Sequence, residues 1–336
     1  MIKAAAYLIA LLALLATPTA TTADAAAVQQ TRLLAGKPRQ LAGASWFGGT
    51  YPTPDGQHVS VFISTRYSSP EPLAQQWVGF FAGLPHGAEL SRATVYVAPL
   101  DQVRDMCASA DVLGCYGGQE LVIPGDVSDG VTPTSIAAHE YGHHIAANRS
   151  NAPWTALDWG TKRWATAMGI CGRVAGGTAF PGDEQENYSL NPGEAFAESY
   201  RVLVETNGTG VGSSWPIVDP SFQPTPDALA AVRDDVLHPW SAPATNTIHA
   251  RFARGARTWR TSITTPLDGD LRLRIDAGAD DVTLLAPGTR TALAKSLWNS
   301  SGGKELDYRV CGARTLSLRV TRGSAAARFT LRISRP

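Results

Sequence analysis

The sequence predicts an α+β fold in two domains, in which a mixed sheet with helices is followed by a small all-β sandwich. Its 336 residues are enough for two hydrophobic cores at about 150 residues per domain. Strand-like and helix-like apolar patterns alternate over residues 46–242. Over residues 250–336 the pattern changes to short strands separated by turn residues, which is typical of a β-sandwich.

The composition excludes several classes of protein. Hydrophobic residues make up 44% of the chain and charged residues 17%, which indicates a folded protein rather than a disordered one. The 29 Lys and Arg residues balance the 29 Asp and Glu residues, so the formal net charge is zero. Because a neutral chain lacks the basic field that attracts polyanions, we expect no nucleic-acid partner. We expect a protein or peptide substrate that is recognised through its backbone and apolar side chains.

Residues 1–27 are typical of a secretion signal. Lys3 supplies a positive charge, and residues 4–16 form an apolar run that is shorter than the roughly 20 residues a membrane-spanning helix needs. Small residues follow, with plausible cleavage after Ala23, Ala25 or Ala27. Retention of the segment as an N-terminal anchor is the alternative. Cleavage predicts a secreted extracellular protein with no stable membrane association, and the Ala-, Gly- and Arg-rich composition indicates a bacterial source.

The four cysteines are Cys107, Cys115, Cys171 and Cys311. An even number in an oxidising compartment favours two disulfides, for which three pairings are possible. Cys107 and Cys115 flank a short glycine-containing loop, so we favour a bond between them and a second bond from Cys171 to Cys311. The chain contains no Cys-x-x-Cys spacing, which argues against a cysteine-based zinc or redox site.

The first domain follows residues 28–45, which show no periodicity and are interpreted as a linker or short pro-segment. Strand patterns on either side of a Pro-Asp-Gly turn predict a hairpin over residues 49–63. Apolar residues at helical spacing predict a helix over residues 71–82, and residues 93–98 are typical of a buried strand. Residues 120–124 predict another strand, which ends in proline. This strand is either an edge strand that an extended substrate could join or a core strand of the sheet.

Four helices are predicted in the rest of this domain. Thr132-Pro133 provides a hydroxyl cap and a first-turn proline for a helix over residues 132–148, and Asn191-Pro192 does the same for residues 191–205. Residues 156–168 and 226–237 predict the other two helices. The last of these lies in a proline-rich segment that is interpreted as the interdomain region.

The second domain, residues 250–336, is predicted to contain six or seven short strands and almost no helix. Turn residues such as Asp268-Gly269 and Pro287-Gly288 separate the strands. The predicted strands lie at residues 258–263, 271–275, 282–285, 308–310, 316–320 and 329–333.

The motif that carries chemistry is His139-Glu140-x-x-His143, inside the helix that begins at Thr132. A spacing of four residues places His139 and His143 on one helix face, so both imidazoles can reach one metal ion. Glu140 is offset by one residue, where its carboxylate can act as general base on a metal-bound water. We therefore predict a catalytic metal site on this helix.

A catalytic zinc site needs a third protein ligand and an open position for water. His144 is rotated by about 100° from the histidine pair, so we expect it beside the site or at the surface. The longer pattern in which a glycine and a third histidine follow the motif fails here, because Ala146 and Arg149 occupy those positions.

Glu194 is the better candidate for the third ligand. It lies at the start of the helix capped by Asn191, 51 residues after His143. Glu198 is one turn further on the same face and could hold an imidazole N–H of a ligand. The alternative is that Glu194 only completes a capping box at this helix N-terminus.

Together, His139-Glu140-x-x-His143 and Glu194-x-x-x-Glu198 resemble the motifs of the gluzincin metallopeptidases. The second motif is closer to the lethal-factor-like branch than to the thermolysin-like branch. The resemblance implies a zincin-like catalytic domain, with zinc held by His139, His143 and Glu194. It also implies that Glu140 is the general base and that Glu198 orients the first histidine.

A further group must stabilise the oxyanion that forms during peptide hydrolysis. The resemblance implies Tyr188 for this role, because lethal-factor-like enzymes use a tyrosine just before the glutamate ligand. Tyr200 and His238 are the alternatives.

The second domain resembles the bacterial pre-peptidase C-terminal domain. The resemblance is one of pattern and rests on the segments Asp280–Leu285 and Arg314–Val320. It implies an appended β-sandwich and leaves the ligand of that domain open.

The sequence therefore predicts a secreted zinc-dependent endopeptidase. The alternative is an extracellular binding or adhesion protein whose zincin domain is inactive or whose zinc is structural. Glu140 favours the enzyme, since a purely structural zinc site does not need a base next to its first ligand.

Overall fold

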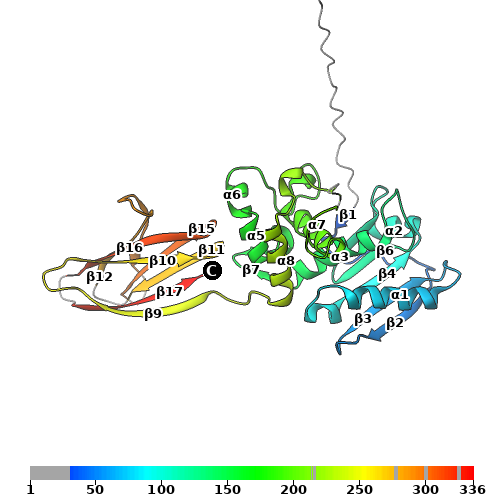
Figure 1. Cartoon of the computed structure of the whole chain (residues 1–336), viewed down its shortest axis with the longest axis horizontal. Helices are drawn as coiled ribbons and strands as arrows, with labels where there is room; N and C mark the ends of the chain where they lie inside the picture. The colour runs from blue at the N-terminus through cyan, green and yellow to red at the C-terminus, as the bar shows by residue number, and fades with distance from the viewer. Residues whose placement is uncertain (1–30, 213, 215–216, 276–278, 299–301, 324–326) are drawn as a thin grey trace, which may run out of the picture.

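The computed structural model describes residues 31–212, 214, 217–275, 279–298, 302–323 and 327–336. Figure 1 shows two units along the long axis, a mixed unit in blue to green and an all-β unit in yellow to red. The predicted α+β class and the predicted all-β C-terminal region are confirmed. The predicted signal peptide, residues 1–27, lies outside the described residues.

The first domain is built on a six-stranded sheet with the order β1-β5-β6-β4-β3-β2. Strands β3, β4 and β6 are parallel, whereas β2 runs antiparallel to β3 and β5 runs antiparallel to β6. The predicted hairpin is β2 with β3. The bounds are β1 (Thr31–Leu33), β2 (Trp46–Pro52), β3 (His58–Ser64), β4 (Thr94–Ala98), β5 (Gly114–Gly117) and β6 (Glu120–Pro124).

The strand predicted at residues 120–124 is β6, and it lies inside the sheet between β5 and β4. The edge-strand interpretation is therefore wrong. The strand outside β6 is β5, a four-residue segment with glycine at both ends and no apolar alternation to reveal it. Strand β1 pairs with β5 in parallel, so residues 31–33 of the segment interpreted as a linker are a strand. Residues 28–30 of that segment lie outside the described residues.

Helices cover both faces of this sheet. On one face, α1 (Pro70–Gly83) and α3 (Pro133–Ala147) meet through the rings of Phe81 and Tyr141, whose centroids are 5.7 Å apart. On the other face, α2 (Leu100–Cys107) packs through Met106 against Val122 of β6. Helices α7 (Pro192–Glu205) and α8 (Pro226–Leu237) then continue the core beyond α3.

The helix predicted over residues 156–168 is interrupted. It consists of α4 (Ala156–Trp159) and α5 (Lys162–Ala167). Gly160 separates them with a φ of +74°, a left-handed conformation that ends a helix, and the ring of Trp164 fills the space where a side chain would lie. Helix α6 (Ile170–Ala175) follows, and two short strands precede α4, namely β7 (Ser150–Asn151) and β8 (Trp154–Thr155).

Helices α3 and α7 pack with their backbones unusually close. A Cβ atom at Gly142 of α3 would lie 2.6 Å from the Cα atom of Ala197 in α7, so the contact depends on glycine. Because Gly142 lies between the two histidines of the motif and Ala197 follows Glu194 by three residues, this contact brings the predicted ligands of the two helices together.

We expect Gly142→Ala to push α7 away from α3 and to destabilise the protein by about 1–3 kcal/mol. Chemical denaturation of the metal-free protein measures the free energy of unfolding. Gly172→Ala is the matched control, because a Cβ atom at this glycine of α6 meets nothing within 4 Å. If Gly142→Ala unfolded at the same denaturant concentration as the wild type, the close approach would not exist.

The second domain is a sandwich of two sheets, with the orders β10-β16-β12-β13 and β14-β15-β11-β17-β9. Leu284 and Leu318 from the first sheet pack with Leu273 and Leu331 from the second. The six predicted strands are present. The described strands are β9 (Ala244–Arg251), β10 (Thr258–Thr265), β11 (Gly269–Ile275), β12 (Ala279–Leu285), β13 (Ala292–Lys295), β14 (Leu297–Trp298), β15 (Lys304–Val310), β16 (Arg314–Arg322) and β17 (Arg328–Arg335).

The sandwich begins at Ala244 rather than at residue 250. Strand β9 is an edge strand whose residues are mostly exposed, so it lacks the apolar alternation by which the other strands were predicted.

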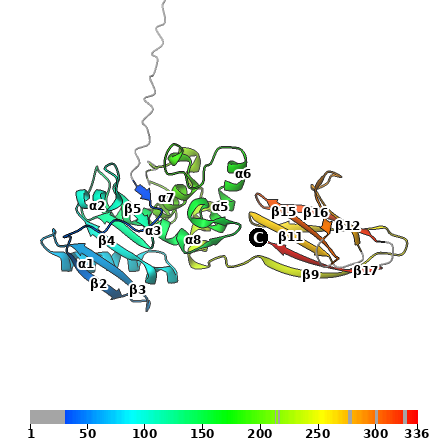
Figure 2. The ribbon, with the colours of Figure 1, turned by 180° about the vertical axis from the view of Figure 1, so that it is seen from behind.

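The two predicted disulfides are confirmed. One joins Cys107 at the end of α2 to Cys115 in β5, and the other joins Cys171 in α6 to Cys311 of the sandwich. Figure 2 shows α5 and α6 as the helices of the first domain that lie nearest the sandwich. The second disulfide therefore ties the two domains together. Within the described part of the chain, no helix is long and apolar enough to span a membrane.

Candidate metal centre

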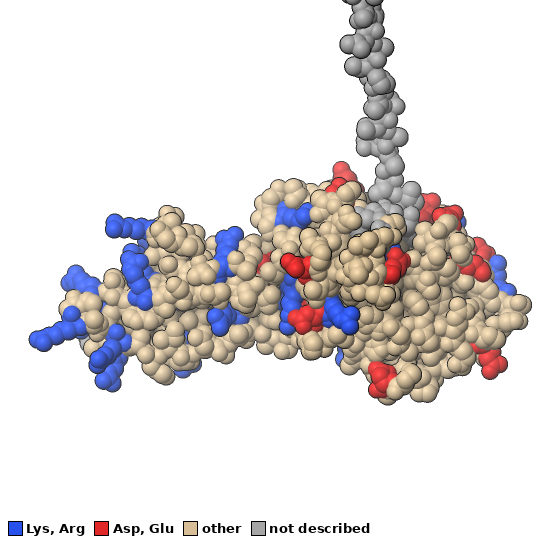
Figure 3. Space-filling model, viewed as in Figure 1, with Lys and Arg blue, Asp and Glu red and all other residues tan. Residues whose placement is uncertain are grey.

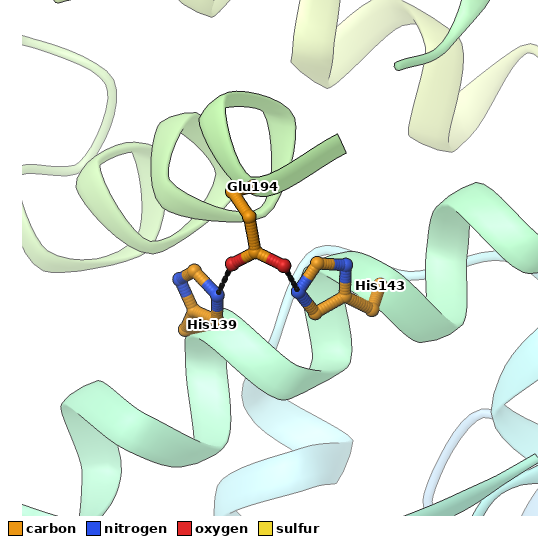
Figure 4. A group of neighbouring side chains, drawn as sticks. All are labelled: His139, His143 and Glu194. Carbon is orange, nitrogen blue, oxygen red and sulfur yellow. Dashed lines mark hydrogen bonds and ion pairs between the residues drawn. The ribbon is translucent and has the colours of Figure 1, made fainter. Parts of the chain in front are cut away.

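Helix α3 carries the two histidines of the motif at the centre of the first domain. Thr132 caps the helix by accepting a hydrogen bond from the backbone N–H of Ser135 at 3.2 Å. His139 and His143 are fully buried, and their ring centroids are 4.9 Å apart. Figure 4 shows that both imidazoles point toward the carboxylate of Glu194 on α7.

Glu194 lies in the first turn of α7 with its carboxylate between the two imidazoles. Its Oε2 atom is 3.1 Å from Nε2 of His139, and its Oε1 atom is 3.3 Å from Nε2 of His143. The cap of α7 is Asn191, whose side chain accepts a hydrogen bond from the N–H of Gly193 at 3.0 Å. Helix capping therefore belongs to Asn191, and the carboxylate of Glu194 faces the histidines.

These three side chains fit a metal ion. They present two imidazole nitrogens and one carboxylate oxygen within 4.8 Å of one another. Nε2 of His143 is completely buried, and its contact with Oε1 of Glu194 at 3.3 Å is an ion-pair contact rather than a well-formed hydrogen bond to a described residue. Such an atom costs about 1–3 kcal/mol when it stays unpartnered, and a metal ion would satisfy it. Two histidines and one glutamate are a donor set that zinc accepts.

Glu140 is buried beside the histidine pair. Neither of its carboxylate oxygens has a hydrogen-bond partner in the described part of the chain. Its Oε1 atom faces the edge of the sheet, 2.9 Å from the position that a Cβ atom at Gly114 would take. Burial raises the pKa of Glu140 well above its usual value, and the charge of His139 offsets part of this shift. A carboxylate in this state can accept and hold a proton.

Glu198 and Arg201 support the first histidine from behind. Oε2 of Glu198 accepts a hydrogen bond from Nδ1 of His139 at 3.1 Å, and Oε1 accepts one from Nη2 of Arg201 at 2.6 Å. Burial alone would raise the pKa of Glu198, but the hydrogen bonds from His139 and Arg201 hold it below its usual value. This contact leaves Nε2 of His139 as the nitrogen that faces Glu194.

Tyr188 brings its hydroxyl to the centre from the turn just before α7. The hydroxyl donates a hydrogen bond to Oε2 of Glu194 at 2.9 Å. Burial raises the pKa of Tyr188 well above its usual value, so the phenol remains a donor. The two alternatives lie elsewhere. Tyr200 donates to the carbonyl of Pro85 at 2.6 Å, and His238 is exposed at the end of α8.

His144 does not lie at the surface. Its ring is buried, and Nε2 donates to the carbonyl oxygen of Glu89 at 2.8 Å. Burial lowers the pKa of His144 to about 4, so the ring is neutral. The surface interpretation is wrong because α3 is buried around most of its circumference, and the rotation by one residue turns His144 toward Glu89 instead of toward solvent.

Thr31 of β1 is part of the centre and was not predicted. Its Oγ1 atom lies 3.1 Å from Nε2 of His139, 3.3 Å from Oε2 of Glu194 and 2.7 Å from the hydroxyl of Tyr188. Its carbonyl oxygen lies 3.2 Å from the same tyrosine hydroxyl and is a second, longer acceptor for its single proton. The hydroxyl of Thr31 therefore lies in contact with two of the three candidate donors, His139 and Glu194.

Glu184 is the second residue that sequence reasoning missed. One carboxylate oxygen accepts the backbone N–H of Leu33 in β1 at 3.2 Å, and the other accepts the side-chain amide of Asn191 at 2.7 Å. Burial, with the charge of Glu194, raises the pKa of Glu184 to about 9. Glu184 was missed because nothing in the polar segment around it distinguishes that segment from a surface loop. Thr31 was missed because its contact depends on a strand that shows no periodic pattern.

A cavity of about 170 Å³ adjoins His139. Its lining combines apolar side chains with hydroxyls and one ion pair, and includes Thr31, Thr132, Ser135, Ile136, Arg201 and Ile217. The cavity is large enough for one amino-acid side chain beside His139.

Comparisons with known proteins leave the chain without an assigned family. No protein-family model matches it, and no curated protein matches it. Among solved structures, the pre-peptidase C-terminal domain of a collagenase from Bacillus anthracis covers 27% of this chain and 87% of its own, with 12% identity and a TM-score of 0.22. PliG from Aeromonas hydrophila, a periplasmic inhibitor of g-type lysozyme, covers 25% of this chain and 91% of its own, with 16% identity and a TM-score of 0.15.

Proposed function

We propose that this protein is a secreted zinc-dependent endopeptidase with a gluzincin-type, zincin-like catalytic domain. One observation carries the proposal. His139, His143 and Glu194 converge from two helices, and the carboxylate of Glu140 is buried beside them without a partner among the described residues. Three protein donors and a nearby carboxylate that can act as base are what metal-assisted hydrolysis requires of the protein.

The residues of the chain have distinct roles in this proposal. A bound zinc ion would supply Lewis acidity and lower the pKa of a bound water. Glu140 accepts the proton of the attacking water and delivers it to the leaving amine. Tyr188 donates a hydrogen bond to the oxyanion of the scissile carbonyl. Glu198 keeps His139 in the tautomer and orientation of a ligand.

The two disulfides support the secreted location. All four cysteines form disulfides, and no free cysteine remains in the described part of the chain. Proteins of oxidising compartments typically show this pattern. The substrate class remains protein or peptide.

Cleavage of a peptide library or of azocasein by the metal-loaded protein, with and without a chelator, tests the proposal. We expect cleavage that the chelator abolishes and added zinc restores. The contact of Thr31 with the donor group favours a second candidate, in which the hydroxyl closes a structural zinc site and the protein only binds its partner. Stoichiometric zinc without cleavage of any peptide would exclude the enzyme and support this alternative.

We infer that strand β1 moves away when a substrate binds, because the hydroxyl of Thr31 contacts both His139 and Glu194. The strand is only three residues long and is held by its pairing with β5 and by Glu184. We expect that its release, by cleavage of a protease sequence placed in the exposed residues 35–37, raises kcat/KM by about tenfold. The rate at which a chelator removes zinc should rise as well. Unchanged rates after complete release would mean that β1 does not cover the centre.

A further inference from the structure

The chain has no net charge because an excess of basic residues in the sandwich balances an excess of acidic residues in the first domain. Residues 244–336 contain 16 Lys and Arg against 7 Asp and Glu, a formal charge of +9. Residues 31–243 contain 12 Lys and Arg against 21 Asp and Glu, a formal charge of −9. In Figure 3 the Lys and Arg side chains gather on the sandwich, many at the end away from the first domain. The total charge was therefore a poor guide to possible partners.

The basic side chains are placed against each other across the strands. Arg251 of β9 lies directly opposite Arg328 of β17, and Arg260 of β10 lies opposite Arg319 of β16. In the same way, Arg274 of β11 lies opposite Arg332 of β17. Like charges in such positions destabilise a sheet. Glu305 compensates Arg274, whereas Arg251, Arg328 and Arg260 have no ion pair with a described residue, so an external anion could compensate them.

Acidic side chains neutralise few of these arginines. Among the described residues of the sandwich, the ion pairs are Arg272 with Asp307, Arg274 with Glu305, and Arg309 with Asp270. These pairs all lie on β11 and β15. The described arginines at the far end form no ion pair with a described residue, and they are Arg251, Arg254, Arg257, Arg260 and Arg328. We call these five residues the distal arginines.

A shallow hollow of about 500 Å³ lies on the outer face of the five-stranded sheet. It runs across β9, β17 and β11. Its lining residues are rich in hydroxyls and contain no carboxylate, and among them are Thr245, Thr247, His249, Arg274, Thr330 and Arg332. Hydroxyl, imidazole and guanidinium groups can hydrogen-bond to sugar hydroxyls and to the carboxylate or sulfate groups of an acidic sugar.

We propose that the sandwich binds an acidic polysaccharide through this hollow and the distal arginines. The guanidinium groups pair with the anionic groups of the polymer, and the hydroxyl-rich hollow receives its sugar hydroxyls. A polymer that follows β17 toward Arg328 passes from the hollow to the far end of the domain, since both lie along this strand.

Two other classes of anionic partner fit less well. Single-stranded nucleic acid is usually held by aromatic stacking platforms, and no tryptophan, tyrosine or phenylalanine lines the hollow. A membrane surface would use exposed apolar side chains. The exposed pair Leu297 and Trp298 lies on β14, at the opposite edge of the sheet from β9. None of the large apolar side chains that are exposed among the described residues lines the hollow, so the hollow offers no group that would insert into a membrane.

Binding of the full-length protein to heparin and to polygalacturonate, measured as Kd against salt concentration, tests the proposal without any cleavage assay. We expect Arg251→Gln/Arg328→Gln and Arg274→Gln/Arg332→Gln each to raise Kd by about tenfold and to lower the salt slope by about one to two. Arg66→Gln/Arg233→Gln is the matched control. It changes the total charge equally but lies in the first domain, so its Kd should stay within about twofold of the wild type.

Three results would overturn the proposal. The first is equal affinity of the wild type and both sandwich variants. The second is an equal loss of affinity in the control, which would show that only total charge matters. The third is tighter binding to duplex DNA or to vesicles with anionic lipids than to both polysaccharides at the same salt concentration. Since no arm depends on zinc or on cleavage, failure of the proposed peptidase function would leave this test intact.

Discussion

Glu140→Gln is expected to lower kcat/KM for peptide cleavage by about 10³-fold while the zinc content stays unchanged. Glutamine preserves the shape of the side chain but cannot accept the proton of the attacking water. The effect should be large because Glu140 is the only carboxylate on α3, so no neighbouring residue of this helix can replace it as the base. Steady-state cleavage of a fluorogenic peptide, together with metal analysis of the same sample, measures both quantities.

Glu140→Asp is the informative companion variant, because it keeps the carboxylate but withdraws it by one methylene. We expect it to retain part of the activity that Glu140→Gln loses. Wild-type activity of metal-loaded Glu140→Gln would show that another group is the base, and the proposed mechanism would fall even if zinc is bound.

Glu194→Ala is expected to weaken zinc binding by about 10³-fold, since removal of one of three protein donors leaves only the two histidines of α3. Competition with a fluorescent chelator measures the zinc affinity. Glu186→Ala is the matched control, because Glu186 is an exposed carboxylate in the segment that leads to α7. Equal zinc affinity in Glu194→Ala and in the wild type would remove Glu194 from the ligand set.

The sequence was most informative where local chemistry determines local structure. The hydroxyl cap and proline at Thr132-Pro133, and the amide cap at Asn191, located the starts of the two helices that carry the motif. The spacing within each helix then determined which side chains share a face. For this reason His139, His143 and Glu194 could be selected together before the fold was known.

Prediction failed where an element depends on its neighbours. Strands β1 and β5 are three and four residues long and show no alternation, so only their pairing with each other and with β6 makes them strands. Consequently the choice between an edge strand and a core strand for β6 stayed open, and the contact of Thr31 with His139 and Glu194 could not be foreseen. The break at Gly160 depends on the ring of Trp164, which a periodic apolar pattern does not reveal.

The disulfide between Cys171 and Cys311 gives the sandwich a second covalent attachment, in addition to the chain that leads from α8 into β9. A domain held at two points cannot swing freely, as it would on a single flexible linker. If the sandwich rests on a polymer, the metal centre would then stay at one height and in one orientation above it. Proteins attached to the same polymer at that height would meet the centre at a high effective concentration. The rate of encounter with freely diffusing proteins would rise little.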